Sequence, residues 1–514
     1  MADKEEQEKK SGSAAAFLFG RKQIFTSIKE LTAENVVGEI NSALPYHIEN
    51  LLSEEYLYWY RRGIHPILNR VKQVRPEICN KIVENHADEI VSFKNGYFLT
   101  QPAFYVTRTE GVQKGRDVAK LNDYLYLSGK QQADNEIVDW FHTVGLGVAY
   151  IEPQDDQDTP VAVYSLDPRS AFVVYSLSPG NKPVYAVNTA VDGETLYIDV
   201  YTREKYFKLI GTVTGKTTTA YPEGYTCTAT SVKEEMENPL GEIPIIEYRY
   251  SSINVGAFET VLPLLDAIDL VQSNRLDGIE QFIQSLLIFY NCELGTDEKG
   301  KQITASYVRE AGALFLKSIG ENKADLKEIS SQLDQTQTQV LVDDLYEKIL
   351  TICGMPSTTK GGKSTSDTGT AVLARDGWYQ ADTFARNTED HFRKSNKQFD
   401  KVFLKILQEK GLVSKKLKRT DFDLQFTRNE TANAQSKAQA FSTMISSGIA
   451  PELAAAKSGI SNDPVADIAK SMKWIKMIFG DPDKVEKENK TGEGEAKIIQ
   501  QDNSTGNNET GGAV

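Results

Sequence analysis

The sequence predicts an α+β protein in which helical segments flank one strand-rich region. Three observations support this fold class. The 514 residues are too many for one hydrophobic core, so several domains or an elongated multi-region chain are expected. Residues from about 145 to 250 form β-branched and aromatic runs separated by turn residues, whereas apolar residues on either side recur at helical spacing. Hydrophobic residues make up 40% and charged residues 25% of the chain, as in ordinary folded proteins.

The first hundred residues are predicted to be mainly helical. Residues 1 to about 20 mix charged residues with Ser, Gly and Ala, and we expect them to be disordered. Apolar residues then recur three or four positions apart from about Asn50 to Lys94, which indicates helices that Pro66 and Pro76 divide. Residues 93–106 predict a turn followed by a strand.

The strand-rich region is predicted to be a meander. Runs such as Val161–Leu166, Ala171–Tyr175 and Leu196–Tyr201 are typical of strands because they are rich in β-branched and aromatic residues. Asp192-Gly193 lies between two such runs, where this pair predicts a tight hairpin turn.

Three long helices are predicted in the second half of the chain. The first covers 265–287, which corresponds to roughly 35 Å at the usual helical rise. A compact insertion at 288–328 separates it from a second helix at 329–353. A loop rich in Gly, Ser and Thr, at 354–369, leads to the third helix at 370–410.

Shorter elements are predicted toward the C-terminus. A strand is expected at Phe422–Phe426 and helices at about 432–447, 451–458 and 464–479. Residues 481–514 are charged and rich in Gly, Asn and Thr, so we expect them to be disordered.

Motif spacing argues against an enzyme or a metalloprotein. The four cysteines are far apart, and the five histidines form no HExxH motif. Gly362-Lys363-Ser364 matches the end of a phosphate-binding loop, but Ser357 stands where its first glycine should be. We therefore predict no catalytic residue, metal or cofactor. No apolar stretch reaches about 18 residues, so no transmembrane helix is expected.

The net charge of the chain bears on whether it can be a nucleic-acid-binding protein. The net charge is −14 at pH 7. A protein that grips nucleic acid over a broad surface usually carries basic patches that displace counterions, and the acidic balance argues against that class. It does not exclude a protein past which DNA slides.

Several segments, taken in order, resemble those of one family, the portal proteins of long-tailed phages. Asn95–Tyr105 is similar to the family's segment at the start of the wing, although Thr100 replaces the usual glycine. Gly147–Ile151 and Leu166–Phe172 resemble the β part of the wing. Gly354-Met-Pro356, followed by Thr368-Gly-Thr-Ala371 in place of the frequent Ser-Gly-x-Ala, resembles the tunnel-loop segment.

The resemblance implies a subunit with a wing, a stem of long helices, a clip inserted between them, a tunnel loop and a helical C-terminal crown. Its regions in this chain would be a flexible N-terminus at 1–35, the wing at 36–257 with helices before a β meander, stem helices at 258–287 and 329–353, a small α/β clip at 288–328 with a strand at 313–317, the tunnel loop at 354–369, a long wing helix at 370–410, the crown at 411–480 and a disordered tail at 481–514.

The resemblance also implies a function. Twelve subunits would form a ring at one capsid vertex, through which double-stranded DNA is packaged and ejected. Terminase and head-completion or connector proteins would dock on the clip, and major capsid and scaffolding proteins would contact the ring. The protein would reside in the virion after synthesis in the host cytoplasm, with no membrane partner. An intracellular multi-domain enzyme, or a scaffold protein without a DNA role, remains the alternative.

Three groups of site residues follow from the resemblance. An acidic channel wall avoids long-lived phosphate contacts; the stem residues expected there are Asp266, Asp269, Asp277, Glu280, Asp343, Asp344 and Glu347. The tunnel-loop residues expected to contact DNA are Lys360, Gly361, Gly362, Lys363 and Ser364. The expected docking charges of the clip are Lys299, Lys301, Arg309 and Lys317. The alternatives are an ordinary solvated helix face for the acidic residues and a solubilising surface loop for the lysines.

Overall fold

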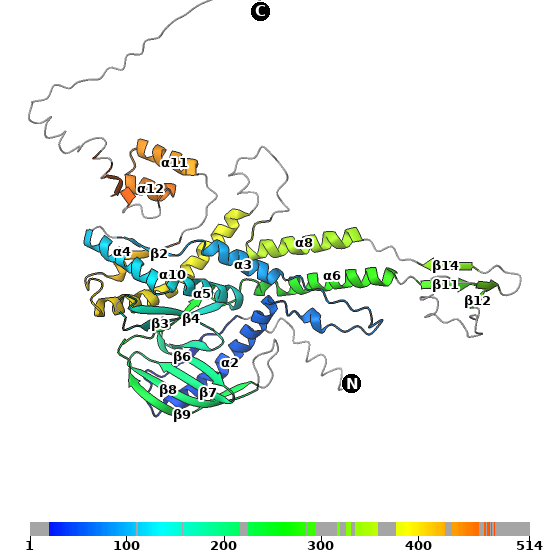
Figure 1. Cartoon of the computed structure of the whole chain (residues 1–514), viewed down its shortest axis with the longest axis horizontal. Coiled ribbons are helices and arrows are strands. Elements are labelled where there is room, and N and C mark those ends of the chain that lie inside the picture. Colours follow the sequence, from blue (N-terminus) through cyan, green and yellow to red (C-terminus); the bar gives the residue numbers. More distant parts are fainter. Residues whose placement is uncertain are drawn as a thin grey trace, which may run out of the picture. The chain divides into compact units, whose positions relative to one another are not determined.

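The chain forms two compact units, unit 1 at residues 1–431 and unit 2 at 432–514. Helices and strands are both abundant, which confirms the α+β class (Figure 1). Within the part that the structure describes, no helix is long and apolar enough to cross a membrane. The computed structural model describes residues 20–108, 112–156, 158–215, 225–283, 286–290, 292–294, 316–318, 325–329, 335–357, 377–426, 434–461 and a few single residues up to 477.

A long non-helical segment separates the first two long helices of unit 1. Helix α2 covers Val36–Arg61 and helix α3 covers His86–Phe98. In the intervening residues 62–85, only the short 3-10 helix η2 (Pro66–Asn69) is helical. The predicted helical pattern from Asn50 to Lys94 is therefore wrong over 62–85, because backbone N–H groups of this segment donate to side chains of the distant helix α6 where a helix would bond to its own carbonyls.

Residues 93–144 also differ from the prediction. The turn expected from residue 93 is wrong, because α3 continues through Asn95 and Gly96 to Phe98. The predicted strand is present as β2 (Phe104–Thr107). Helices α4 (Val112–Leu127) and α5 (Lys130–Val144) follow and were not predicted.

The predicted strand meander is confirmed. Its strands form a six-stranded sheet in the order β1-β5-β6-β7-β8-β9 and a three-stranded sheet in the order β10-β3-β4. Asp192 pairs with Thr195, so Asp192-Gly193 does begin the tight hairpin. The strands are β1 (Ile24–Thr26), β3 (Leu146–Pro153), β4 (Val161–Leu166), β5 (Ala171–Ser176), β6 (Pro183–Asp192), β7 (Thr195–Tyr201), β8 (Lys205–Thr214), β9 (Thr226–Glu237) and β10 (Ile245–Arg249).

Two long helices lie side by side and lead into paired strands (Figure 1). Helix α6 covers Leu262–Ile283 after the 3-10 helix η3 (Glu259–Val261), and helix α8 covers Gln335–Cys353. Strand β11 (Leu286–Tyr290) pairs antiparallel with β14 (Asp325–Ile329). The helices expected to reach residue 287 and to start at 329 are thus shorter than predicted, since the apolar run of β11 satisfies its backbone in a strand pair.

The remaining elements fit the prediction more closely. Strand β12 (Cys292–Leu294) pairs with β13 (Leu316–Ser318), which overlaps the strand predicted at 313–317. The third long helix is α10 (Trp378–Glu409). The 3-10 helix η4 (Arg419–Asp421) precedes strand β15 (Phe422–Gln425), which pairs with β2.

Unit 2 contains two short helices in its described residues. Helix α11 covers Ala434–Ser446, and α12 covers Pro451–Ser458 with the bounds predicted from the sequence. Pro451 stands at the first position of α12, and Gly459 follows it with a positive φ of 64°. These are the local start and stop signals of a helix. Most of the helix predicted at 464–479, like the tail at 481–514, lies outside the described residues.

Residues 20–26, here called the N-terminal strap, connect the six-stranded sheet to the residues just before α6. Strand β1 adds to the six-stranded sheet parallel to β5. Just before it, the Arg21 guanidinium pairs with the Glu259 carboxylate at 2.5 Å, and both side chains are fully buried. Arg21 also donates to the Val144 carbonyl at 3.0 Å. Breaking such a buried pair leaves an uncompensated charge, so the strap is strongly held to α5 and η3.

A buried carboxyl lies next to this strap. Glu54 of α2 is 1% exposed, and one of its carboxylate oxygens has no hydrogen-bond partner among the described residues. Burial raises the pKa of Glu54 to about 8, although the nearby Arg21 acts in the opposite direction. The folded protein therefore holds this carboxyl protonated at neutral pH.

We expect Glu54→Gln to remove one part of the pH dependence of stability. The unfolded carboxyl ionises near pH 4.5 and the folded one near pH 8. Unfolding therefore releases a proton in this window, and the free energy of unfolding falls by about 1.4 kcal/mol per pH unit as pH rises. The neutral amide lacks this loss, so the variant should gain stability relative to the unsubstituted protein between pH 5 and pH 8 in urea titrations. The exposed Glu49→Gln serves as the control, and a gain of the same size there would contradict the assignment.

Candidate functional site

The outer faces of the α6–α8 pair are not covered by any other described residues of unit 1. The helices pack on each other and on α2 and α3 through a shared core that includes Leu265, Ile268, Ile349 and Leu350. Their outer faces leave large apolar side chains in solvent. Among the described residues these are Leu270, Leu276 and Ile279 on α6 and Val340, Leu341 and Ile352 on α8. Large apolar side chains grouped on one element mark a surface that another protein covers.

The acidic residues predicted to line a channel differ in their exposure to solvent. On α6, Asp269 and Asp277 are buried, while Asp266 is half-buried and accepts a hydrogen bond from the Tyr60 hydroxyl at 2.9 Å. Glu280 is exposed and accepts from the Asn80 side chain at 2.8 Å. On α8, Asp343 and Asp344 are exposed and Glu347 is half-buried.

Asp269 holds the start and the end of segment 62–85. Its carboxylate contacts His65 Nδ1 at 2.5 Å and accepts from the Glu84 backbone N–H at 2.8 Å. The other ring nitrogen of His65 lies 3.0 Å from the Tyr60 carbonyl oxygen. The ring of His65 therefore bridges the Asp269 carboxyl and the Tyr60 carbonyl in the interior of the subunit.

Asp277 holds the middle of the same segment two turns further along α6. It accepts from the Asn80 backbone N–H at 2.7 Å and from Lys72 at 3.0 Å, and Arg70 lies at 3.1 Å. Burial favours the neutral acid, but the hydrogen bonds from Asn80 and Lys72 hold the pKa of Asp277 below its usual value. Ser273, between the two carboxylates, accepts from the Ile82 N–H at 2.9 Å.

Segment 62–85 therefore lies along α6 and makes hydrogen bonds to the buried carboxylates of Asp269 and Asp277. The expectation that Asp269 and Asp277 face a channel is not retained for these two residues, because neither side chain reaches the surface of the subunit. Val71 and Val74 on the segment are 83% and 77% exposed, so the segment itself adds apolar surface beside α6.

Contacts among five residues define the two ends of the segment predicted as a tunnel loop. Gly354 ends α8 with φ +67°, and a Cβ there would lie 2.6 Å from the Phe384 ring. The Gln380 side chain donates to the Thr351 carbonyl at 3.1 Å. On the return side, Gly377 precedes α10 with φ +83°, a conformation that favours glycine. These contacts fix where the chain leaves α8 and enters α10. The predicted loop residues Lys360, Gly361, Gly362, Lys363 and Ser364 lie outside the described residues.

The predicted docking charges lie mostly outside the described residues as well. This holds for Lys299, Lys301 and Arg309. Lys317 belongs to β13, where its backbone is in register with Glu293 of β12.

The described residues contain no group of three or more His, Cys, Asp or Glu side chains placed to hold a metal ion. In the same part of the chain, Cys79, Cys227 and Cys353 are free thiols. Burial raises the pKa of the Cys353 thiol to about 11, so it is not activated as a nucleophile.

Comparison with known protein families gives a match over most of the chain. A family model described as phage portal protein, SPP1 Gp6-like, matches residues 47–481. The match extends from α2 beyond α12 and includes all the strands from β2 to β15. No match was found among curated proteins.

We expect Asp277→Ala to release segment 62–85 from α6. The substitution leaves Lys72, Arg70 and the Asn80 N–H without their carboxylate, and removing one partner of a buried charge pair costs about 3 kcal/mol or more. Urea titration would measure the lower free energy of unfolding, and hydrogen exchange would show faster exchange at the Asn80 amide. The difference should shrink in acid, where the carboxyl of the unsubstituted protein takes up a proton.

The matched control is Glu280→Ala, one turn away on the exposed face of α6. Exposed polar contacts contribute about 1 kcal/mol at most. Equal losses in the two variants would contradict the proposed attachment.

Proposed function

The chain belongs to the SPP1 Gp6-like family of phage portal proteins, and from this premise we propose that its copies form a ring at one capsid vertex through which DNA is packaged and ejected. The family is structural rather than enzymatic. The observation that carries the proposal is the family match over residues 47–481. The apolar outer faces of α6 and α8 support it from the structure.

Ring formation accounts for those apolar faces. A contact between different faces of identical subunits repeats until the ring closes. Val340 and Leu341 on α8 are 62% and 47% exposed in the single chain, and Leu276 and Ile279 on α6 are 39% exposed. Burying such side chains is favourable at about 25 cal/mol per Å² of apolar surface. We propose that α8 of one subunit packs beside α6 and segment 62–85 of the next, with the family's twelve subunits as the expected number.

The exposed acidic residues suit the channel side of this ring. Glu280, Asp343 and Asp344 remain at the surface of the subunit, and a closed ring multiplies each of them. An acidic wall repels phosphate instead of exchanging counterions with it, so DNA passes without long-lived contacts. Asp266 and Glu347 are half-buried and would contribute less.

The inserted residues at 288–328 would serve as the clip. Strands β11–β14 extend the chain beyond the α6–α8 pair, as a docking element requires (Figure 1). We propose that terminase binds there during packaging, and head-completion or connector proteins afterwards. Lys299, Lys301, Arg309 and Lys317 are the charges proposed for this docking. The ring would sit in the virion, in contact with capsid and scaffolding proteins.

We expect the purified protein to form rings with a central hole in negative-stain images. Val340→Glu combined with Leu341→Glu should leave the subunit folded, because both side chains are exposed, but should prevent ring closure by burying two charges per contact. Thr228→Glu on the exposed face of β9 is the control and should form rings. If the double variant forms rings as often as the unsubstituted protein, the proposed contact between α8 of one subunit and α6 of the next is refuted. A compact monomer with catalytic turnover would refute the portal assignment.

Replacing Lys360 and Lys363 by Ala should leave ring assembly intact and lower DNA packaging or retention. The reason is that two of the proposed phosphate contacts per subunit would be lost. A packaging assay with Lys394→Ala and Lys397→Ala, exposed lysines of α10, provides the comparison. Normal packaging in the loop variant would exclude the contact.

A further inference from the structure

Two segments that are three hundred residues apart in sequence bring cationic side chains together at a buried aspartate. Asp421 of η4 accepts from the Lys418 backbone N–H at 2.9 Å and pairs with Lys114 of α4 at 2.8 Å. Its own carbonyl accepts from the Arg108 N–H, also at 2.8 Å, just after β2. We call the surface around this junction the basic face, which consists of Arg108, Lys114, Arg116, Lys415, Lys416 and Lys418.

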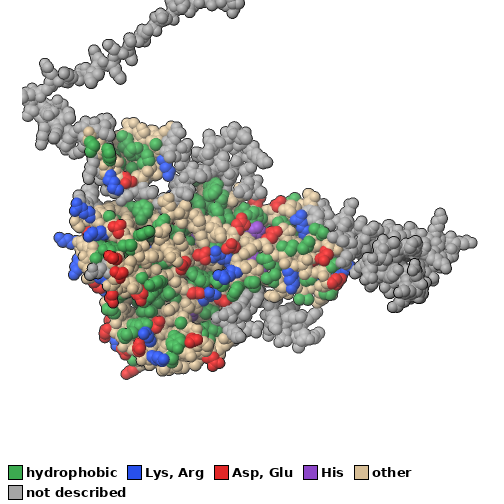
Figure 2. Space-filling view, in the orientation of Figure 1, with side chains coloured by type: hydrophobic (Ala, Val, Ile, Leu, Met, Phe, Trp, Pro, Cys, Tyr) green, Lys and Arg blue, Asp and Glu red, His purple; other side chains and the backbone are tan. Residues whose placement is uncertain are grey.

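Exposed cations outnumber exposed carboxylates around this junction, although Asp123 and Glu409 at its margins are exposed. Within 112–120 and 410–421 the acidic residues are Asp117 and Asp421, and both are buried. Arg116, Lys415 and Lys416 are exposed, and none of the three forms an ion pair with another described residue. Figure 2 shows Lys and Arg side chains gathered at the edge of the molecule where Figure 1 places α4. The basic face thus has a net positive charge in a chain with net charge −14.

Arg419 fixes the turn that carries the lysines, since it pairs with the buried Asp400 and lies 5.2 Å from the centre of the Phe422 ring.

We propose that the basic face holds the phosphate backbone of double-stranded DNA outside the channel. This rests on the proposed function only in identifying the DNA as packaged genome lying against the wing. A row of exposed Lys and Arg side chains neutralises successive phosphates and releases their counterions, without reading the base sequence.

Side-chain composition favours DNA over an acidic protein. Lysine is depleted in protein interfaces, whose centres are apolar and aromatic. The exposed residues at 414–420 are instead Lys415, Lys416, Lys418 and Thr420, and the apolar Val413 and Leu417 are buried. Phosphate contacts require only charge and hydrogen-bond donors, which this surface supplies.

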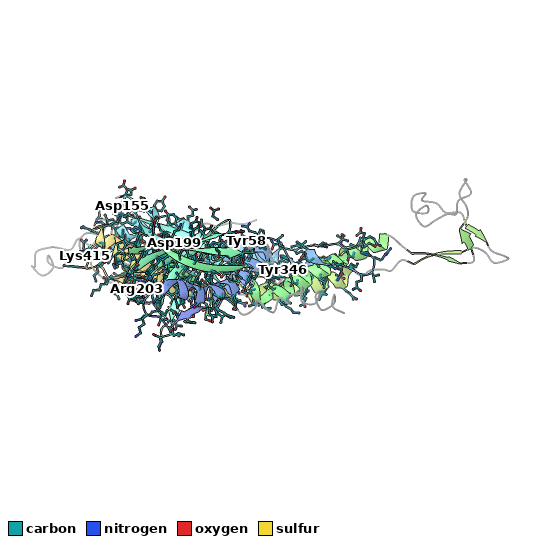
Figure 3. All side chains as sticks on the ribbon, turned by 90° about the horizontal axis from the view of Figure 1, so that it is seen from below. Tyr58, Asp155, Asp199, Arg203, Tyr346 and Lys415 are labelled. Carbon is teal, nitrogen blue, oxygen red and sulfur yellow. The ribbon has the colours of Figure 1, made fainter. Side chains whose placement is uncertain are left out.

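The position of the face agrees with this partner. Figure 3 shows Lys415 at the end of unit 1 away from Tyr346, which lies on α8. The face is therefore remote from the end of the stem from which the proposed clip extends. If the clip faces outward to terminase, the basic face lies on the side of the capsid interior, where packaged DNA is densest.

The test compares DNA binding by the full-length protein and two triple variants. Lys415→Ala, Lys416→Ala and Lys418→Ala remove cations of the basic face. Lys29→Ala, Lys182→Ala and Arg203→Ala are the matched control, three exposed cations elsewhere on unit 1. A fluorescent DNA duplex is titrated between about 50 and 200 mM salt, where phosphate contacts dominate affinity. We expect the face variant to bind about tenfold more weakly, with a salt slope smaller by about 0.9 per lost contact, and the control to bind within about twofold of the unsubstituted protein.

Three outcomes would overturn the inference. These are equal losses in the two variants, duplex affinity unchanged in the face variant, and loss of binding to poly-glutamate alone, which would identify an acidic protein as the partner. Negative-stain images of the same samples separate this inference from the proposed function. Rings in the face variant together with weak duplex binding support both. If the unsubstituted protein forms no rings and the face variant still binds duplex more weakly, only the proposed ring is refuted.

Discussion

The attachment of segment 62–85 to α6 is the constraint on which the surface of the α6–α8 pair depends. Two buried carboxylates, Asp269 and Asp277, hold a chain segment that has almost no regular structure of its own. Each has a backbone N–H donor and a nitrogen-bearing side chain within hydrogen-bond distance, namely His65 for Asp269 and Lys72 for Asp277, so neither carboxyl is buried without a partner. The segment connects α2 to α3, and α6 is thereby attached to these two helices.

This attachment decides which residues remain for other subunits and for DNA. The acidic side chains of α6 are largely used within the subunit, whereas Asp343 and Asp344 of α8 stay at its surface. The apolar side chains beside them, such as Val340 and Leu341, are exposed among the described residues of unit 1. A surface that combines exposed apolar residues with exposed acidic ones suits a helix of which one side packs on a neighbouring subunit and another lines a channel.

At the other end of unit 1, buried acidic residues again leave one kind of charge at the surface. A net charge of −14 describes the whole chain, but not its parts. Around Asp421 the acids are buried and the bases exposed, with Asp400 and Arg419 forming the support behind them. Burial raises the pKa of Asp400 to about 6, partly offset by Arg419. One chain thus offers a repelling surface along the proposed channel and an attracting one away from it.

The sequence by itself determined the features that depend on neighbouring residues. The hairpin at Asp192-Gly193, the strand meander and the bounds of α12 between Pro451 and Gly459 follow from local turn and cap chemistry. The tertiary structure alone decided the roles of the acidic residues. Asp269 and Asp343 look alike in sequence, since both lie on a long helix among apolar neighbours, but one is buried against His65 and the other is exposed. Likewise, the spacing of apolar residues in 62–85 indicated a helix, because nothing local reveals that its backbone bonds to residues two hundred positions away. Long-range pairing of charges has no sequence period, and for that reason only the folded chain could show it.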